Sequence, residues 1–296
     1  MEDIVLNSPK AWFLAARPKT LAGAAVPVMI ALAMSWRFDS GRFAWLPALL
    51  CLFFAFIMQI DANFVNDYFD CLHGNDDDTR LGPQRACAQG WVSMQAMKAA
   101  ICLTSLTACA VGFPLIFYGG WSMLLVGAAC VLFCFLYTTT LSYYGLGDLL
   151  VLVFFGIVPV CATFFIQHHC LTVEVFVASV ACGIAIDALL IVNNYRDIAN
   201  DARAGKRTLI VMVGDRRGRR LYLLSGITAL LLCTVHVFSG HPWAFLLPLL
   251  AYLPLHLSAY RQLCAIGEGR ALNKVLGLTA RNIFVYGLSV AVGSLV

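Results

Sequence analysis

Long apolar runs separated by short polar segments organise the whole sequence. Each run is close to the roughly 20 residues that a helix needs to cross a hydrocarbon layer of about 30 Å. The runs are continuous rather than alternating, which favours helices over barrel strands. The pattern predicts an all-α fold, a polytopic membrane bundle of nine transmembrane helices in one domain over residues 1–296. The predicted spans are approximately 20–37, 45–69, 95–118, 121–141, 146–167, 172–192, 220–239, 242–260 and 278–296.

The composition supports a membrane-embedded chain. Hydrophobic residues make up 61% of the 296 residues and charged residues only 12%, against about 25% charged residues in ordinary soluble domains. So few charges cannot cover the surface of a soluble protein of this length, which excludes a soluble enzyme. The twelve cysteines lie mostly singly within the predicted spans and show no zinc spacing. They are interpreted as apolar packing residues.

Lysine and arginine residues are distributed unequally between the two ends of the predicted spans. If the N-terminus is cytoplasmic, 18 of the 20 lie on the cytoplasmic side, and only Arg37 and Arg42 lie outside. This satisfies the positive-inside rule and places the C-terminus outside. The net charge of +4 is therefore interpreted as topology and contact with anionic lipid headgroups, not as nucleic-acid binding.

Acidic and amide side chains gather at the cytoplasmic end of the second predicted span. Asn63, Asp67 and Asp70 follow one another at i, i+4 and i+7, so on a helix they share one face. A charge inside a bilayer is costly unless it has a partner, which makes this set a candidate site. The next segment contains Asp76 to Asp78, which either bind metal or belong to a solvated loop, and then Arg80.

A second polar set occurs about 130 residues later, at the cytoplasmic end of the sixth predicted span. Asn193, Asp197 and Asp201 follow at i, i+4 and i+8, which on a continuous helix is again one face. Two half-motifs, at 63–85 and 193–208, therefore place the same residue types at the same depth. We expect the two helices to face each other across one site.

The two half-motifs predict a magnesium–diphosphate site. Carboxylates on one face repel each other, so a cation is expected among them. Oxygen donors without His or Cys suit Mg²⁺, which bridges one or two carboxylates to substrate phosphates. Nearby basic residues suit a diphosphate, because Arg offers a bidentate fork and Lys a point charge. The candidate metal ligands are Asn63, Asp67, Asp70, Asn193, Asp197 and Asp201, and the candidate diphosphate contacts are Arg80, Arg196, Lys206 and Arg207.

Several short motifs are spread along the whole chain. The most specific is N-N-x-R-D-x-x-x-D-x-x-x-G-K-R-T-L at 193–209. The others are A-R-P-K-T at 16–20, the segment 59–70, R-L-G-P at 80–83, G-L-G-D at 145–148 and a weaker segment at 272–280. With these motifs the sequence resembles the UbiA-type aromatic prenyltransferase superfamily, above all its 1,4-dihydroxy-2-naphthoate polyprenyltransferase branch.

The resemblance implies a UbiA-like nine-helix bundle in the bacterial plasma (inner) membrane. Asp67, Asp70, Asp197 and Asp201 would act as catalytic residues, holding two Mg²⁺ ions that bind a polyprenyl diphosphate and stabilise the departing pyrophosphate. The ring of 1,4-dihydroxy-2-naphthoate, an aromatic quinone precursor, would attack the allylic cation with loss of CO₂. The product would be demethylmenaquinone, in menaquinone biosynthesis.

The acceptor side departs from the family pattern. The connection after the fourth predicted span reads Y-T-T-T-L-S-Y-Y at 137–144, where a Gly/Pro-containing segment is expected. The expected acceptor contacts are Asn66, Tyr143 and Asp148, although Asp148 equally suits a helix N-terminal dipole. Another acceptor, 4-hydroxybenzoate or homogentisate, stays an alternative.

A secondary transporter is an alternative from a different functional class, because transporters also use repeats and buried acids. The acids here cluster at the cytoplasmic ends of the spans beside arginines, which favours the prenyltransferase. The sequence does not determine the prenyl chain length, the oligomeric state, or the roles of Asp61 and Asp187.

Overall fold

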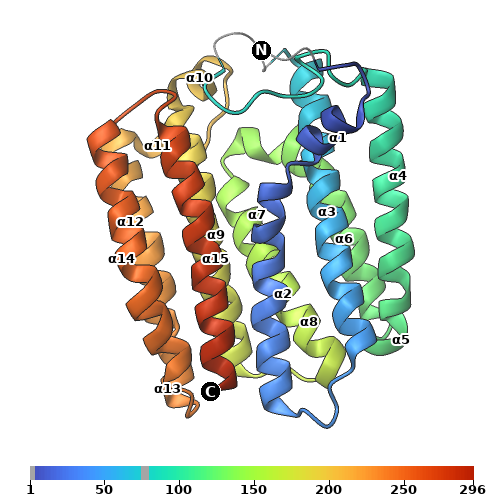
Figure 1. Cartoon of the computed structure of the whole chain (residues 1–296), viewed down its shortest axis with the longest axis vertical. Helices are drawn as coiled ribbons and strands as arrows, with labels where there is room; N and C mark the ends of the chain where they lie inside the picture. Colours follow the sequence, from blue (N-terminus) through green and yellow to red (C-terminus); the bar gives the residue numbers. More distant parts are fainter. Residues whose placement is uncertain (1–3, 75–79) are drawn as a thin grey trace.

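The computed structural model describes residues 4–74 and 80–296, and the regular structure in these ranges is helical (Figure 1). Within them, nine helices are long and apolar enough to cross a membrane, which confirms the predicted bundle. The run Asp76 to Asp78 lies outside the described residues. The spans are α2 (Pro18–Phe38), α3 (Trp45–Leu72), α4 to α5 (Met94–Gly119), α6 (Ser122–Thr139), α7 to α8 (Gly147–His168), α9 (Val173–Arg196), α12 to α13 (Asp215–Phe238), α14 (Trp243–Ile266) and α15 (Leu272–Leu295).

Three spans are built from more than one helical segment. Pro114 and Pro159 lie in the first turns of such segments, where a missing backbone N–H costs least. The segments are α4 (Met94–Gly112), η1 (Phe113–Leu115) and α5 (Ile116–Gly119); α7 (Gly147–Leu152), the π-helical turn η3 (Val153–Ile157) and α8 (Val158–His168); and α12 (Asp215–Leu232) with α13 (Thr234–Phe238). Outside the spans lie α1 (Pro9–Ala16), η2 (Leu141–Tyr144), α10 (Ile198–Arg203) and α11 (Leu209–Val213).

Helix α9 is the central packing element of the bundle and contacts α7, η3, α8, α12 and α15. Its crossing with η3 depends on two glycines. A Cβ on Gly156 would lie 2.6 Å from the Cα of Gly183, and a Cβ on Gly183 would lie 2.7 Å from the carbonyl oxygen of Leu152. Small residues allow such close helix packing inside a membrane. This packing fixes the position of α9, and with it the second half-motif at the end of α9.

The two ends of the bundle carry different features. The end drawn at the top of Figure 1 carries α1, α10 and α11, and the C-terminus lies at the opposite end. At that opposite end, Arg37 Nη2 donates to Glu174 Oε2 at 2.6 Å, and His236 Nδ1 lies 2.6 Å from Glu174 Oε1. These contacts join α2, α9 and α13. Both half-motifs lie at the other end, because α3 and α9 each finish there.

Several helix boundaries differ from the hydropathy prediction. Helix α12 begins at Asp215 rather than near 220, and α14 ends at Ile266 rather than near 260. Helix α15 begins at Leu272 rather than near 278, since the polar Asn273 and Lys274 belong to its first turn. Helix α9 ends at Arg196, and Asp197 leaves the helix with φ −95° and ψ 8°. The expectation of one continuous helical face through the second half-motif was therefore wrong. The short helix α1, which Ser8 caps through its side chain, was not predicted.

Candidate active site

The first half-motif lies at the end of α3, where Asn63, Asp67 and Asp70 are all buried. Their spacing places them along one helical face, as the sequence predicts. Asn63 Nδ2 donates to the carbonyl oxygen of Ala16 and to Thr20 Oγ1, both at 3.0 Å. The Asn63 amide therefore ties α3 to the A-R-P-K-T segment between α1 and α2.

Asp67 accepts hydrogen bonds on both carboxylate oxygens. The backbone N–H of Ala86 donates to Oδ2 and that of Cys87 donates to Oδ1, each at 3.0 Å. Arg17 Nη2 lies 3.9 Å from Oδ2. The Asp67 carboxylate therefore holds the chain at 86–87 against the end of α3.

Asp70 lies between basic side chains from both halves of the sequence. Arg85 Nη2 donates to Oδ2 at 2.7 Å, and Lys206 Nζ lies 3.7 Å from Oδ1. Lys206 belongs to the second half-motif, so this carboxylate brings the two half-motifs together. The sequence reasoning had counted Arg85 only as a topology charge, since nothing in the sequence shows that it returns to Asp70.

Arg196 holds the carboxylate of Asp197 with a bidentate fork. Its Nε donates to Oδ1 at 2.9 Å, and its Nη2 donates to Oδ2. The same Nη2 donates to Asn193 Oδ1 at 2.8 Å. The Arg196 side chain is only 1% exposed. This residue, predicted to contact the diphosphate, therefore binds oxygens of the protein itself.

The carboxylates of the two half-motifs are close enough to affect each other. Burial raises the pKa of Asp201 to about 6; Lys206 opposes this rise, and the carboxylates of Asp197 and Asp70 add to it. The carboxylates of Asp197 and Asp70 therefore favour protonation of Asp201, and a metal cation bound among them would favour its charged form.

The R-L-G-P turn lies against the first turn of α15. Asn273 Nδ2 donates to the carbonyl oxygen of Leu81 at 2.8 Å, and Arg270 Nη2 donates to that of Arg80 at 3.1 Å. Asn273 Oδ1 also accepts from Arg196 Nη1 at 2.8 Å. Asn273 lies in the weak 272–280 match, and no spacing or charge pattern in the sequence distinguishes it as a site residue.

Of the other predicted diphosphate contacts, Lys206 and Arg207 lie beside η2, and Arg80 lies in the R-L-G-P turn. Lys206 Nζ lies 5.1 Å from the centre of the Tyr143 ring, a cation–π contact. The backbone N–H of Arg207 donates to the carbonyl oxygen of Tyr143 at 3.0 Å, and the Arg207 residue is exposed. Arg80 Nε donates to the carbonyl oxygen of Pro83 at 3.0 Å. The G-K-R-T-L segment is thus attached to the loop in which the sequence departs from the family pattern.

Two acidic residues lie beside Tyr137, at the contact between α6, α7 and α9. A Cβ added to Gly147 would lie 3.7 Å from the Tyr137 ring and 3.5 Å from the Leu190 side chain. The Tyr137 hydroxyl interacts electrostatically with Asp148, with Asp187 and with carboxylates of both half-motifs. Atom Oδ1 of each of these two acids is buried without a hydrogen-bond partner in the described part of the chain. They are suited to bind hydroxyl groups of a ligand.

Asn66 and Asp61 have partners on neighbouring helices. Asn66 Oδ1 accepts from Thr138 Oγ1 on α6. The fully buried Asp61 accepts from the hydroxyl of Thr104 and, at 2.9 Å, from that of Ser105, both on α4. Asp61 is therefore a structural link between α3 and α4, an explanation that the sequence did not provide.

The donor chemistry of the site fits magnesium. No group of three or more His, Cys, Asp or Glu side chains is arranged to hold a metal among residues 4–74 and 80–296. Mg²⁺ is usually bound by one or two carboxylates together with substrate phosphates and water. The mutually repelling carboxylates around Asp201, with Lys206 and Arg207 beside them, suit that arrangement.

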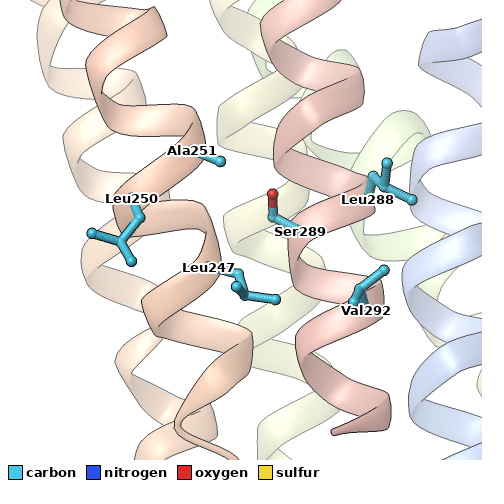
Figure 2. Close-up of a pocket in the computed structure, with 6 residues that line it drawn as sticks. All are labelled: Leu247, Leu250, Ala251, Leu288, Ser289 and Val292. Atoms are coloured by element: carbon cyan, nitrogen blue, oxygen red, sulfur yellow. The ribbon is translucent and has the colours of Figure 1, made fainter.

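A separate groove lies between α14 and α15 (Figure 2). Its lining is apolar apart from the Ser289 hydroxyl, and it contains none of the predicted site residues. The lining residues are Leu247, Leu250, Ala251, Leu288, Ser289 and Val292. Nothing in this lining could perform chemistry on a diphosphate.

Comparison with known proteins identifies the family. Residues 24–286 match the UbiA prenyltransferase family. The chain belongs to this family. It is 34% identical to the 1,4-dihydroxy-2-naphthoate octaprenyltransferase of Escherichia coli, over 83% of this chain and 84% of that protein. It is also 34% identical to the enzyme with the same name from Mycobacterium tuberculosis, over 95% of each chain.

Solved structures share the fold of this UbiA prenyltransferase. A UbiA homologue from Archaeoglobus fulgidus bound to GPP and Mg²⁺ superposes with a TM-score of 0.67 at 12% identity, over 95% of this chain and 99% of that one. The apo structure of a UbiA homologue from Aeropyrum pernix K1 gives 0.67 at 15% identity, over 92% and 97% of the two chains. The protein is a multi-pass, membrane-embedded prenyltransferase.

Proposed function

We propose that this protein transfers a polyprenyl chain from polyprenyl diphosphate to 1,4-dihydroxy-2-naphthoate, with loss of CO₂, to form demethylmenaquinone. The observation that carries the proposal is the contact of Asp70 with Lys206, which joins two Asp-rich half-motifs into one site. The names of relatives at 34% identity support the acceptor. Because both relatives are named as 1,4-dihydroxy-2-naphthoate enzymes, we favour this acceptor over 4-hydroxybenzoate or homogentisate.

Two magnesium ions would be held by carboxylates of the two half-motifs. Asp67 and Asp70 would face one ion and Asp197 and Asp201 the other, with the amides of Asn63 and Asn193 beside them. When bound, the metal would neutralise charge that develops on the departing pyrophosphate. In the structure, Arg85 and Lys206 balance the charge of Asp70; metal entry would compete with these contacts.

Basic residues would hold the diphosphate from the side of the second half-motif. Lys206, already placed between Asp70 and Tyr143, would contact a phosphate oxygen as a point charge. Arg207 contacts Tyr143 through its backbone N–H, and Arg80 begins the R-L-G-P turn; both side chains would add bidentate contacts. These charges favour breakage of the allylic C–O bond, because they stabilise the leaving group more than the substrate.

The acceptor would lie beside Tyr137, Asn66 and Tyr143. Unpartnered oxygens of Asp148 and Asp187 would accept hydrogen bonds from the two ring hydroxyls and so raise the electron density of the ring. The ring carbon that bears the carboxylate would attack the allylic carbon, a C–C bond would form, and CO₂ would leave. We expect Asp148→Asn and Asp187→Asn each to raise KM for the acceptor by about 10- to 100-fold and to leave KM for the diphosphate unchanged.

The distribution of charges supports a cytoplasmic active-site mouth in a bacterial inner membrane. The end of the bundle with both half-motifs also carries most of the Lys and Arg residues, and the positive-inside rule assigns that end to the cytoplasm. The N-terminus would then be cytoplasmic and the C-terminus outside.

The decisive experiment incubates the detergent-solubilised protein with labelled polyprenyl diphosphate and separate aromatic acceptors. We expect prenylation and CO₂ release with 1,4-dihydroxy-2-naphthoate, abolished by EDTA and restored by Mg²⁺. Asp67→Ala and Asp197→Ala should each lower turnover by roughly 1,000-fold or more, while Arg42→Gln, in the exposed connection between α2 and α3 at the opposite end of the bundle, should not. Prenylation of 4-hydroxybenzoate alone would refute the acceptor, and a rate that EDTA leaves unchanged would refute the metal site.

A further inference from the structure

The guanidinium of Arg196 is buried, and side-chain oxygens of three other residues accept its hydrogen bonds. To the described residues it makes four hydrogen bonds, two to Asp197, one to Asn193 and one to Asn273. A guanidinium has five N–H donors, so these bonds use most of them. With a side chain that is 1% exposed, Arg196 offers little surface to a diphosphate in the described part of the chain.

The backbone of the R-L-G-P turn closes over the same guanidinium. A Cβ added to Gly82 would lie 2.8 Å from Arg196 Nη2, so only glycine lets the turn approach this closely. The neighbouring carbonyl oxygen, that of Leu81, accepts from Asn273 Nδ2 at 2.8 Å. Asn273 therefore contacts the turn with its amide nitrogen and Arg196 with its amide oxygen.

We infer that Asn273 is a positioning residue that acts through Arg196 to set the carboxylate of Asp197 for metal binding. Arg196 correspondingly orients Asp197 instead of gripping the diphosphate. The inference rests on the proposed function, in which Asp197 binds metal, and it assigns a role to the first turn of α15.

The geometry explains why this contact controls the carboxylate. Both Asp197 oxygens are held by one rigid, planar group, so a rotation of the guanidinium turns the carboxylate with it. Asn273 fixes the opposite edge of that plane through Nη1. Groups that orient a metal ligand typically change metal affinity by 10- to 100-fold when they are removed.

The test measures metal binding without turnover. Mn²⁺, as a paramagnetic substitute for Mg²⁺, is titrated into the purified full-length protein in the presence of inorganic pyrophosphate, and free Mn²⁺ is followed by EPR. We expect Asn273→Ala to weaken Mn²⁺ binding about 10-fold or more. Asn273→Asp keeps an oxygen acceptor for Arg196 and should stay within about threefold of the wild type.

Asn282→Ala is the matched control for a defect in α15. Asn282 lies in the same helix, is 1% exposed, and its Nδ2 donates to the carbonyl oxygen of Leu255 at 3.0 Å. It should lower thermal stability as much as Asn273→Ala and leave Mn²⁺ affinity unchanged. Equal Mn²⁺ affinity in Asn273→Ala and the wild type, or an equal loss in Asn273→Asp and Asn273→Ala, would overturn the inference.

Steady-state kinetics distinguish an Arg196 that positions Asp197 from an Arg196 that binds the diphosphate directly. Arg196→Lys and Asn273→Ala should both raise the Mg²⁺ concentration needed for half-maximal rate and leave KM for polyprenyl diphosphate unchanged at saturating Mg²⁺. A raised KM in Arg196→Lys alone would show the direct contact and overturn the inference. Failure of the wild type to bind Mn²⁺ with pyrophosphate would instead refute the metal site of the proposed function, and this inference with it.

Discussion

Arg85 donates to the carboxylate of Asp70 at 2.7 Å, with both side chains close to fully buried. The pair connects the segment after the R-L-G-P turn to the end of α3. Lys206 approaches the other oxygen of the same carboxylate, so protein cations surround a group that we propose to bind metal. The charge of the site is therefore balanced in two ways, by basic side chains or by a metal with its diphosphate.

Replacing Arg85 should show whether metal and diphosphate can compensate for a lost basic partner of Asp70. Arg85→Gln removes the cation that lies 2.7 Å from the buried carboxylate of Asp70. We expect the metal-free protein to lose about 3–5 kcal/mol in free energy of unfolding. Addition of Mg²⁺ and pyrophosphate should recover most of that loss. Thermal unfolding in detergent, with and without both additions, measures the effect.

The control for that experiment is an ion pair at the surface. Arg219 lies 3.0 Å from Asp215, whose side chain is 61% exposed. Surface pairs contribute about 0–1 kcal/mol, so Arg219→Gln should change stability little, with or without metal. An equal loss in the two variants would contradict a special role for the Arg85–Asp70 pair.

Asp67→Asn should damage both stability and turnover. An amide has one acceptor oxygen, so one of the two backbone N–H groups now bound by Asp67, from Ala86 or Cys87, would lose its partner. We expect a loss of about 1–3 kcal/mol in free energy of unfolding, seen as a lower melting temperature without metal. Prenyl transfer at saturating Mg²⁺ should also disappear. If Asp67→Asn had the same melting temperature as the wild type, these hydrogen bonds would not contribute to stability.

Metal affinity should fall as the pH is lowered through about 6. The pKa of Asp201 is raised to about 6 by burial, with Asp197 and Asp70 adding to the shift. Above that pH the carboxylate is charged and available to metal; below it, the proton must be displaced first. Mn²⁺ titrations between pH 5 and 7.5 should show the decline, and Asp201→Asn should bind more weakly at pH 7 and flatten the profile. A wild-type affinity independent of pH would contradict the assignment.

Asp61→Asn tests whether Asp61 stabilises the fold without taking part in the reaction. The amide keeps one acceptor for the hydroxyls of Thr104 and Ser105 and loses the other. We expect a loss of about 1 kcal/mol in free energy of unfolding, with turnover per folded molecule within about threefold of the wild type. If turnover fell as far as in Asp67→Asn while folding was intact, Asp61 would belong to the reaction.

The predictable part of this structure is the part set by local sequence. Apolar runs longer than a bilayer is thick identified all the spans, because backbone groups in lipid must bond within their own helix. The spacing of Asn63, Asp67 and Asp70 gave the correct face of α3, since helical periodicity depends only on neighbours along the chain. The same reasoning failed at Asp197, where contacts with Arg196 accompany the end of α9.

What the sequence could not provide are contacts between distant segments. Asp61 looks like an unexplained intramembrane acid until α4 places Thr104 and Ser105 beside it. Asn273 looks like an ordinary polar residue until the first turn of α15 brings it to Arg196. Such partners are determined by helix packing. The repeated Asn/Asp motif predicted that the two half-motifs meet, as Asp70 and Lys206 do, but hydropathy does not show which other helices are neighbours.

The contact between Arg37 and Glu174 has a consequence for biogenesis. The two residues are 137 positions apart in the chain, and synthesis at about 5–20 residues per second separates their appearance by roughly 7–27 s. During that interval α2 must reside in the bilayer with an arginine whose counter-ion has not yet been made. The ion pair can therefore form only after α9 has been made, and His236 reaches the same glutamate only after α13 has followed.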